Sequence, residues 1–591
     1  MPSPAVTSSP PSPNAVSSRE WVVLAVAFLI AAALRCAWPA RADVEHFDEG
    51  VYAANEYSAE TDFQYPRREL YAPPLFPAMA GWAITFAKDP AAAVWVSILG
   101  GVLTIPLVWW TARSWFGPVA GGVVVLLAAT SEYHIWLSRA ALTDVWLCLW
   151  MTAGAYAGWR GMLSGRPLWL FGAGACAALA WWTKYNGWLT LAVIGGGWLV
   201  AFVVATFRQP NWGLVVPVSS AILRWAGIAL AAAALWYPVW KGLAPVGGYA
   251  AVAKNHSGYF VGLSGWLTSL VQQVAAQQTA LGWTTLLGAA LAFGGGAILS
   301  RAGLSRTMAL GLVWFPLTFF GTNAVGALGV AAILLIAWDR EPFLQGLDED
   351  DQYERWLGWG MAAAWLGGLS LAVPLYRPYP RLSLPWLVGT WFALGAGIPW
   401  ILAAVDSVRQ KRRDVVAAVL LVVAFCLPVV RQMTGPSQPG LAWEDRTGMR
   451  EAARQLQATL VEHVKTVPPT RIAEVGAIVY VVGEPALFCH LSAQEPRSPV
   501  RYFTRADASL GMLEPGQTDV RVPTYVVLGG RAARAMRSDL DRFANALVRV
   551  PLPPARQSRL IALDEFPAWT LDGRPEQTTN EIECYYVNAD R

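Results

Sequence analysis

The sequence is divided by long apolar runs, and their length is the strongest constraint on its fold. A helix of about 20 apolar residues spans the hydrocarbon core of a bilayer, where every backbone polar group must be bonded within the protein. The runs therefore predict a polytopic bundle of transmembrane helices. Fourteen candidate segments can be drawn, at 20–39, 72–88, 91–112, 118–137, 141–158, 168–188, 191–207, 222–241, 281–300, 307–320, 322–338, 356–375, 385–406 and 414–430.

Basic residues in the short loops set the expected orientation. The densest group, Arg409, Lys411, Arg412 and Arg413, lies just before the last apolar segment. Positively charged loops stay in the cytoplasm, so the last span should carry the residues after it to the outside. Counting back, the other basic loops also fall inside, at Arg113, Arg160 and Arg166, Arg208 and Arg224, and Arg301 and Arg306.

This orientation requires an odd number of crossings if the N-terminal tail is cytoplasmic. The tail, residues 1–19, is rich in Pro and Ser and is expected to be disordered. The weakest candidate crossing is 72–88, which is short and opens with Ala72-Pro73-Pro74. We expect it to lie along the membrane or to re-enter it, which leaves about thirteen spans in a membrane domain at 20–431.

Charge density rises after the last span. Residues 432–591 hold 37 of the 84 charged residues, about 23% of their positions against about 11% before them. The change predicts a small soluble C-terminal domain on the extracytoplasmic side. Strands are expected at 475–482, 524–528 and 583–587 and helices at 446–460 and 531–547, which together indicate an α/β domain.

The cysteines allow one disulfide, and the net charge argues against one class of partner. Cys489 and Cys584 lie in the soluble domain, where they could form one disulfide if it faces an oxidising compartment. The formal charge of +4 is too small to indicate a nucleic-acid partner.

Most unusual polar residues of the membrane region are predicted on its outer face. The first outer loop, 40–71, contains His46-Phe47-Asp48-Glu49-Gly50-Val51-Tyr52, with two adjacent carboxylates. This pair is also typical of a helix cap and first helical turn. The same face receives Arg139, Asp144, Lys184, Arg381 and, in a second long outer loop at 242–280, His256. Each could singly be a cap or an interface anchor, but ionisable residues at membrane depth usually line a substrate path.

Carboxylates and cations gathered at a membrane face suit a phosphate-bearing substrate. Arg and Lys neutralise phosphate oxygens. A carboxylate can take the proton of an attacking hydroxyl, and cations stabilise the charge that grows on a departing phosphate. Transfer of a sugar from a lipid phosphate, through an oxocarbenium-like centre, needs these parts.

Five short motifs occur in an order that resembles the integral-membrane GT-C glycosyltransferases, specifically the bacterial relatives of protein O-mannosyltransferases and of the lipid A aminoarabinose transferase (family 39-like). They are Phe47-Asp48-Glu49-Gly50-Val51-Tyr52, Pro73-Pro74-Leu75, Leu137-Ser138-Arg139-Ala140-Ala141-Leu142-Thr143-Asp144, Thr183-Lys184-Tyr185-Asn186-Gly187 and Tyr379-Pro380-Arg381-Leu382. The ordered set is specific to the superfamily and does not indicate a particular substrate.

The resemblance implies a mainly α, GT-C-like fold and a polyprenyl-phosphate sugar donor used on the extracytoplasmic face. It places the catalytic carboxylates at Asp48, with Glu49 beside it, and at Asp144. The donor phosphate would be held by Arg139, Lys184 and Arg381. Independently of the resemblance, aromatic side chains near this face could stack on sugar rings or anchor the membrane interface. The substrate-binding candidates are Tyr52, Tyr71, Tyr185, His256 and Tyr379.

The resemblance also raises a divalent metal as a cofactor. His256 lies in the loop where the aminoarabinose transferases have a metal-ligating histidine. Those enzymes have a Glu two positions before the Pro-Pro pair as a second ligand, whereas this chain has Tyr71 there, and Glu69 is two residues further away. His256 is therefore the candidate ligand, and no metal is assigned.

Two other classes of function remain open from the sequence. A transporter or flippase of a lipid-linked or anionic substrate would also explain charges in the membrane region, but it should show inverted repeats and polar residues near mid-membrane. A structural or assembly protein whose outer domain binds a partner would leave Asp48, Arg139, Asp144 and Lys184 unexplained. The glycosyltransferase hypothesis places the protein in a bacterial cytoplasmic membrane and leaves the acceptor open as a lipid, a glycan or a protein.

Overall fold

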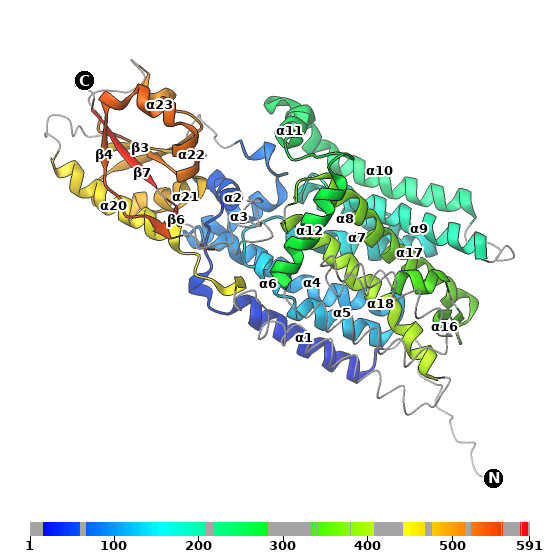
Figure 1. Cartoon of the computed structure of the whole chain (residues 1–591). Helices are drawn as coiled ribbons and strands as arrows, with labels where there is room; N and C mark the ends of the chain where they lie inside the picture. Colours follow the sequence, from blue (N-terminus) through cyan, green and yellow to red (C-terminus); the bar gives the residue numbers. More distant parts are fainter. Residues whose placement is uncertain are drawn as a thin grey trace, which may run out of the picture.

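The computed structural model describes residues 16–58, 67–208, 217–281, 332–338, 341–344, 346–378, 380–406, 441–466, 476–514, 522–556, 558, 579–580 and 582–588. Within them the chain is mainly helical, with a small sheet domain beside a helical bundle (Figure 1). The bundle contains α1 Ser18–Cys36, α2 Phe47–Ser58, α3 Leu75–Ala87, α4 Ala92–Phe116, α5 Pro118–Thr130, α6 Glu132–Ser138, α7 Asp144–Ser164, α8 Pro167–Thr183, α9 Leu189–Arg208, α10 Val218–Gly242, α11 Gly248–Ser257, α12 Trp266–Leu281, α16 Glu341–Leu344, α17 Glu349–Ala372 and α18 Leu384–Asp406.

Five described helical segments are long and apolar enough to cross a membrane, which supports an integral membrane protein. They are Ala92–Phe116, Leu189–Phe207, Val218–Gly242, Glu349–Leu375 and Arg381–Trp400, and the bent pair α5–α6 would make a sixth if it is one span. Helices α1, α7 and α8 form at three other predicted spans without meeting this measure. The count of thirteen is therefore not reached within the described residues.

Several sequence predictions fall outside the described part of the chain. These are the spans at 281–300, 307–320 and 414–430, most of 322–338 and of the tail, and the basic residues Arg301, Arg306, Arg409, Lys411, Arg412 and Arg413. Of the weak candidate 72–88, α3 forms only 13 residues. At about 1.5 Å per residue this helix is roughly 20 Å long, shorter than the ~30 Å core of a bilayer.

Small residues bring the helices of the bundle close together. In the α9–α17 pair, a Cβ on Gly360 would lie 2.3 Å from the carbonyl oxygen of Gly197, and a Cβ on Gly197 would lie 2.6 Å from the sulfur of Met361. Helices in a membrane associate largely through such close backbone packing, because lipid supplies no hydrophobic drive between them. The two glycines therefore set the spacing of α9 and α17.

A buried arginine supports the bend between α5 and α6. The two helices meet at an angle of 56°. Arg35 of α1 is fully buried and donates to the carbonyl oxygens of Ala128 and Ala129, each at 3.1 Å, and to Nδ1 of His134 at 2.7 Å. Carbonyls that a bend releases from helical bonding need such a partner in an apolar interior. Arg35 thereby holds the turn from which α6 begins.

The C-terminal domain is a five-stranded sheet between helices. Its strand order is β2-β1-β3-β7-β4, with β1 parallel to β2 and β3, and β7 antiparallel to β3 and β4. One face packs with α20 and α21, and the other with α22 and α23 (Figure 1). The elements are α20 Gly448–Thr466, β1 Ala477–Val482, α21 Pro485–Gln494, β2 Tyr502–Asp507, β3 Thr524–Leu528, α22 Gly530–Ala535, α23 Arg537–Arg542, β4 Leu547–Val550 and β7 Glu583–Val587, beside a two-stranded ribbon of β5 Ala555–Arg556 and β6 Thr579–Asn580.

Two local predictions for this domain were wrong. The single helix expected at 531–547 is two short helices, because the backbone leaves the helical region at Met536 and the chain then enters strand β4. The conditional disulfide does not form either, since Cys489 and Cys584 are separate, buried thiols. Cys489 donates to the carbonyl oxygen of Gly50 in the bundle at 3.4 Å.

Candidate active site

The first predicted carboxylate, Asp48, pairs with an arginine from the opposite end of the bundle sequence. Asp48 lies in the first turn of α2, and its Oδ2 is 2.5 Å from Nη2 of Arg381 in the short 3-10 turn Pro380–Ser383. Both side chains are largely buried. The carboxylate of Asp48 thus faces a cation and is not only a helix cap. The structure joins two motifs that are separated by more than 300 residues in the sequence.

The second predicted carboxylate, Asp144, pairs with Lys184. Asp144 is the first residue of α7, and its Oδ1 accepts a hydrogen bond of 2.6 Å from Nζ of Lys184, the residue that ends α8. Asp144 is fully buried, and its Oδ2 has no hydrogen-bond partner among the described residues. The side chain of Lys184 is 18% exposed, so its ammonium group is the accessible end of this pair.

Tyr133 lies within electrostatic reach of one member of each ion pair. It is a buried residue of α6, directly after the bend that Arg35 supports, and the charges of both Asp144 and Arg381 act on it. The carboxylate of one pair and the cation of the other therefore lie in the neighbourhood of the same tyrosine. Tyr133 was not predicted as a site residue, although the polar interruption Thr130-Ser131-Glu132 in an apolar run could have drawn attention to it.

Glu49, the neighbour of Asp48, has a different environment. Its Oε2 accepts from the backbone N–H groups of Glu45 at 3.1 Å and His46 at 2.9 Å, and it also pairs with Nη2 of Arg446. Its Oε1 accepts from the N–H of Ala141 at 2.5 Å. Burial alone would raise the pKa of Glu49, but Arg446 and these donors hold it below its ordinary value. This carboxylate is occupied by structural bonds.

Arg139, predicted to bind phosphate, is directed to the backbone instead. Its Nη1 donates to the carbonyl oxygens of Arg35 at 2.7 Å and Ala37 at 2.6 Å, and its Nη2 to that of Trp38 at 3.2 Å. Its Nε donates to Ala442 at 2.8 Å. The side chain is 1% exposed and holds the end of α1 against the chain that leads into the soluble domain.

The predicted aromatic residues divide into two groups. Tyr185 donates from its hydroxyl to the carbonyl oxygen of Glu69, and its ring packs edge-on against His256, with centroids 6.2 Å apart. Tyr71 lies against Phe47, next to Asp48, at 5.8 Å. Tyr52, by contrast, is buried in the core. Tyr379 lies outside the described residues.

His256, the candidate metal ligand, lies among aromatic rings. Its Nδ1 lies 2.9 Å from the carbonyl oxygen of Val252, and its ring neighbours are Tyr185 and Tyr259. No group of three or more His, Cys, Asp or Glu residues that could hold a metal occurs in the described part of the chain. A divalent metal prefers several carboxylate or imidazole ligands in one place. The metal-binding role of His256 therefore stays a prediction.

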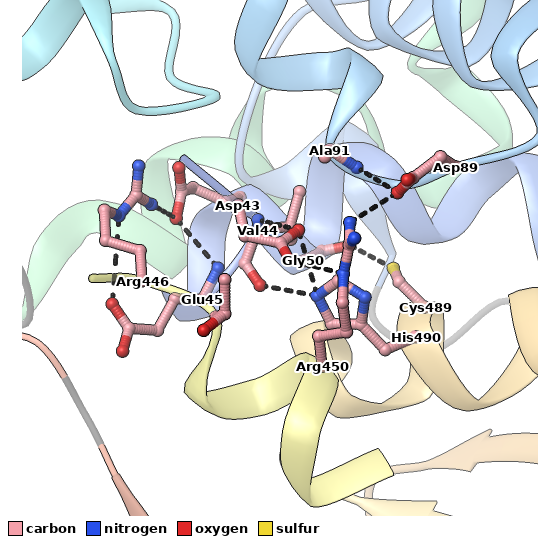
Figure 2. A network of polar contacts seen from close by, with 12 residues as sticks. Asp43, Val44, Glu45, Gly50, Asp89, Ala91, Arg446, Arg450, Cys489 and His490 are labelled. Atoms are coloured by element: carbon pink, nitrogen blue, oxygen red, sulfur yellow. Dashed lines mark hydrogen bonds and ion pairs between the residues drawn. The ribbon is translucent and has the colours of Figure 1, made fainter. Parts of the chain in front are cut away.

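A second charged network lies where the C-terminal domain meets the segment between α1 and α2 and the residues before α4 (Figure 2). Arg450 of α20 pairs with Asp43 at 2.6 Å and with Asp89 at 2.6 Å. His490 of α21 lies 2.8 Å from the carbonyl oxygen of Val44. Sequence reasoning missed this network, because its members lie about 400 residues apart.

At the same interface, the backbones of α2 and α21 approach each other closely. A Cβ on Gly50 in α2 would lie 2.2 Å from the backbone nitrogen of Ala486 and 2.5 Å from the carbonyl carbon of Pro485 in α21. A side chain at position 50 would therefore separate the two helices. Glycine here allows α2, which carries Asp48, to lie directly against the soluble domain.

Comparison with known protein families matches part of the chain. Residues 83–231, about a quarter of the chain, match the family described as dolichyl-phosphate-mannose-protein mannosyltransferase. The match includes Asp144 and Lys184, and it confirms the resemblance to the GT-C glycosyltransferases over this part of the chain. No protein of curated function matches the sequence significantly.

Two solved structures are similar to this chain at low sequence identity. One is ArnT from Cupriavidus metallidurans bound to undecaprenyl phosphate, with 14% identity, a TM-score of 0.49, and coverage of 96% of this chain and 98% of that one. The other is the Archaeoglobus fulgidus oligosaccharyltransferase tethered to an acceptor peptide with the NVT sequon, with 13% identity, a TM-score of 0.44, and coverage of 86% and 69%.

Proposed function

We propose that the protein is a membrane glycosyltransferase that moves a sugar from a polyprenyl-phosphate donor to a lipid, glycan or protein acceptor on the extracytoplasmic face. The observation that carries the proposal is the pairing of Asp48 with Arg381 and of Asp144 with Lys184, in two largely buried ion pairs. Two carboxylates and two cations are the groups that this reaction needs. The family match over residues 83–231 supports the same reaction class.

Asp48 is assigned as the general base. In the transfer, the acceptor hydroxyl oxygen forms a bond to the anomeric carbon, and its proton passes to the carboxylate of Asp48. The bond from that carbon to the phosphate oxygen breaks, and its electron pair stays on the departing polyprenyl phosphate. Arg381, which pairs with Asp48 at 2.5 Å, can exchange to a phosphate oxygen when the donor enters, because guanidinium binds phosphate as well as carboxylate.

Lys184 and Asp144 are assigned to donor and acceptor alignment. The partly exposed ammonium of Lys184 can neutralise a second phosphate oxygen as negative charge grows there. Asp144 fixes Lys184 through Oδ1 and acts on the substrate through that ammonium group. The proposed phosphate site does not include Arg139, whose donors are bonded to backbone carbonyls.

The aromatic residues beside the ion pairs are assigned to substrate contact. Tyr185 and His256 pack together at the second outer loop, and Tyr71 lies beside the first turn of α2. Aromatic faces of this kind bury the apolar faces of sugar rings. Tyr379 precedes the turn that carries Arg381 and keeps its predicted place in this group, whereas Tyr52 belongs to the core.

The test is transfer by purified protein folded in detergent. The protein is incubated with a panel of radiolabelled polyprenyl-phosphate sugars and membrane extract, and radiolabel in a new product is measured. We expect Asp48→Asn to lower the rate by about 10²- to 10⁴-fold, the usual contribution of a general base. Asp89→Asn is the matched control, since Asp89 pairs with Arg450 at the domain interface.

Each result of this test has a clear meaning. Transfer that depends on Asp48 and not on Asp89 would support the proposal and identify the donor. Near-normal turnover by a folded Asp48→Asn variant would refute the assignment of Asp48. Binding of a labelled donor with no transfer to any acceptor, and with movement of the donor across a vesicle membrane, would favour the transporter hypothesis.

A further inference from the structure

Arg446 lies at the junction of the soluble domain with the bundle, just before α20, and is 3% exposed. Its backbone N–H donates to the carbonyl oxygen of Arg41 at 2.9 Å. Its guanidinium pairs with Glu49 through Nη2 and donates to the carbonyl oxygen of Arg139 through Nη1. Its Nε lies 3.8 Å from Glu45 (Figure 2). One buried side chain therefore contacts two separate segments of the bundle.

These two segments carry the two carboxylates of the candidate site. Glu49, the partner of Arg446, adjoins Asp48 in the first turn of α2. Glu49 also accepts from the N–H of Ala141 at 2.5 Å, in the turn that leads to Asp144 three residues later. Arg446 thus bonds to both sides of this connection, to Glu49 on one side and to the carbonyl of Arg139 on the other. The distance between the two turns depends on this arrangement.

We propose that Arg446 is a positioning residue for sugar transfer, and that the soluble domain thereby supplies part of the scaffold of the active site. The proposal rests on the proposed function, because it assigns Arg446 to the spacing of Asp48 and Asp144. Arg446 acts through Glu49 and through the backbone at 139–141, and it touches no substrate. An error of about 1 Å in the placement of reacting groups can lower a rate by about 10²-fold.

Arg450 provides a matched control for this proposal. It lies four residues further along the chain and crosses the same interface, with both of its ion pairs at 2.6 Å. Its partners, Asp43 and Asp89, lie outside the turns that carry Asp48 and Asp144. Loss of Arg450 therefore weakens docking of the soluble domain without removing a contact to either turn.

The experiment compares Arg446→Met, Arg446→Lys and Arg450→Met in the full chain. We expect Arg446→Met to lower kcat by about 10²-fold with a much smaller change in the KM for the donor. Arg446→Lys keeps the charge but loses the forked guanidinium, so it should restore part of the rate. Hydrogen exchange is the second readout: amides at 45–49 and 139–142 should exchange faster in Arg446→Met and not in Arg450→Met.

A double variant covers the case in which Arg446→Met fails to fold. Removing Arg446 leaves the charge of Glu49 buried without its partner, which is strongly destabilising. Arg446→Met with Glu49→Gln removes that charge, so it should fold while kcat stays low. Wild-type rate and wild-type exchange in this folded double variant would overturn the proposal, and so would equal losses in Arg446→Met and Arg450→Met.

Failure of the proposal and failure of the proposed function are distinguishable. If the wild-type protein transfers no sugar, the proposed function fails, and faster exchange at 45–49 and 139–142 in Arg446→Met alone still supports the positioning role. If the wild-type protein transfers sugar and the Arg446 variants keep its kcat, the positioning role fails while the function stands.

Discussion

The two adjacent carboxylates Asp48 and Glu49 lie in regions of opposite character. Asp48 faces the bundle and is paired with Arg381, a cation that can exchange its partner for a phosphate. Glu49 faces the soluble domain, is fully buried, and accepts from three backbone N–H groups and from Arg446. The contacts of Asp48 suit a substrate-binding site, and those of Glu49 suit a structural interface between the soluble domain and the bundle. Neighbouring acidic residues in one helical turn can thus serve catalysis and assembly separately.

The most direct test of this comparison is whether variants of Glu49 and Asp48 differ in stability. We expect Glu49→Ala to destabilise the fold by about 3–5 kcal/mol, because it leaves the buried Arg446 without its charged partner. Asp48→Asn should lower the unfolding midpoint less, because asparagine keeps an oxygen that can accept from Arg381 and this pair is less completely buried than that of Glu49 and Arg446. Thermal unfolding of both variants in the same detergent measures the difference. Equal midpoints for the two variants would contradict the division of roles.

In the candidate active site, we expect variants of Lys184 and Asp144 to differ, one changing mainly the KM for the donor and the other mainly kcat. We expect Lys184→Met to raise the KM for the donor by about tenfold or more, because one charge-assisted contact to phosphate is lost. Asp144→Asn should lower kcat more than it changes KM, since it disturbs the alignment of Lys184. Steady-state kinetics with a varied donor concentration tests this. If Lys184→Met changed mainly kcat and Asp144→Asn mainly KM, the two roles would have to be exchanged.

The stability that the interface between the soluble domain and the bundle provides should also depend on pH, through Glu45. Burial raises the pKa of Glu45 to about 7, although Arg446 and Ser558 act in the other direction. A raised pKa in the folded state means that the native protein holds a proton which the unfolded chain has lost. The contribution of Glu45 to stability is therefore fully present below about pH 4.5 and is lost as pH rises through about 7, by at most ~3 kcal/mol.

Unfolding midpoints at pH 5 and pH 8 measure this effect. We expect a lower midpoint at pH 8 for the wild-type protein and a smaller difference for Glu45→Gln, which resembles the protonated side chain. Glu49, with its lowered pKa, does not titrate in this window. A wild-type midpoint that rises between pH 5 and pH 8 while that of Glu45→Gln does not would contradict the role of Glu45.

The smallest effect is expected at His256. Because this side chain bonds to the carbonyl of Val252 and packs on aromatic rings, His256→Asn should change the transfer rate by less than about threefold. Treatment with EDTA should leave the rate unchanged in the same assay. A loss of more than tenfold in both experiments would instead point to a metal held through His256.

Local signals in the sequence predicted much of the fold. Apolar runs indicated α4, α10, α17 and α18, and short runs rich in Val and Tyr indicated β3 and β7 with the bounds that the structure has. The helix at 531–547 failed because periodicity does not show where a short helix breaks and a strand begins. The number of spans stays a prediction, since several lie outside the described residues.

The candidate site was predicted in part, for a similar reason. Asp48, Asp144, Lys184 and Arg381 could be selected because a charge in an apolar region is conspicuous. The role of Arg139 could not, since the carbonyls that it binds belong to α1 and to the turn before α20. Arg446 lies in a charged region where one arginine does not stand out. The roles of Arg139 and Arg446 depend on contacts between distant segments, and the residue type alone does not predict those contacts.

The contact of Glu49 with Arg446 spans 397 positions of the sequence. Its consequence appears during biosynthesis, because a chain grows at about 5–20 residues per second. The first outer loop is made early, yet its arginine partner leaves the ribosome roughly 20–80 seconds later at that speed. During this interval Glu49 has no access to Arg446, and the turns at 45–49 and 139–141 lack their common anchor. A nascent chain therefore carries an incomplete site until the soluble domain has been synthesised and has reached the same side of the membrane.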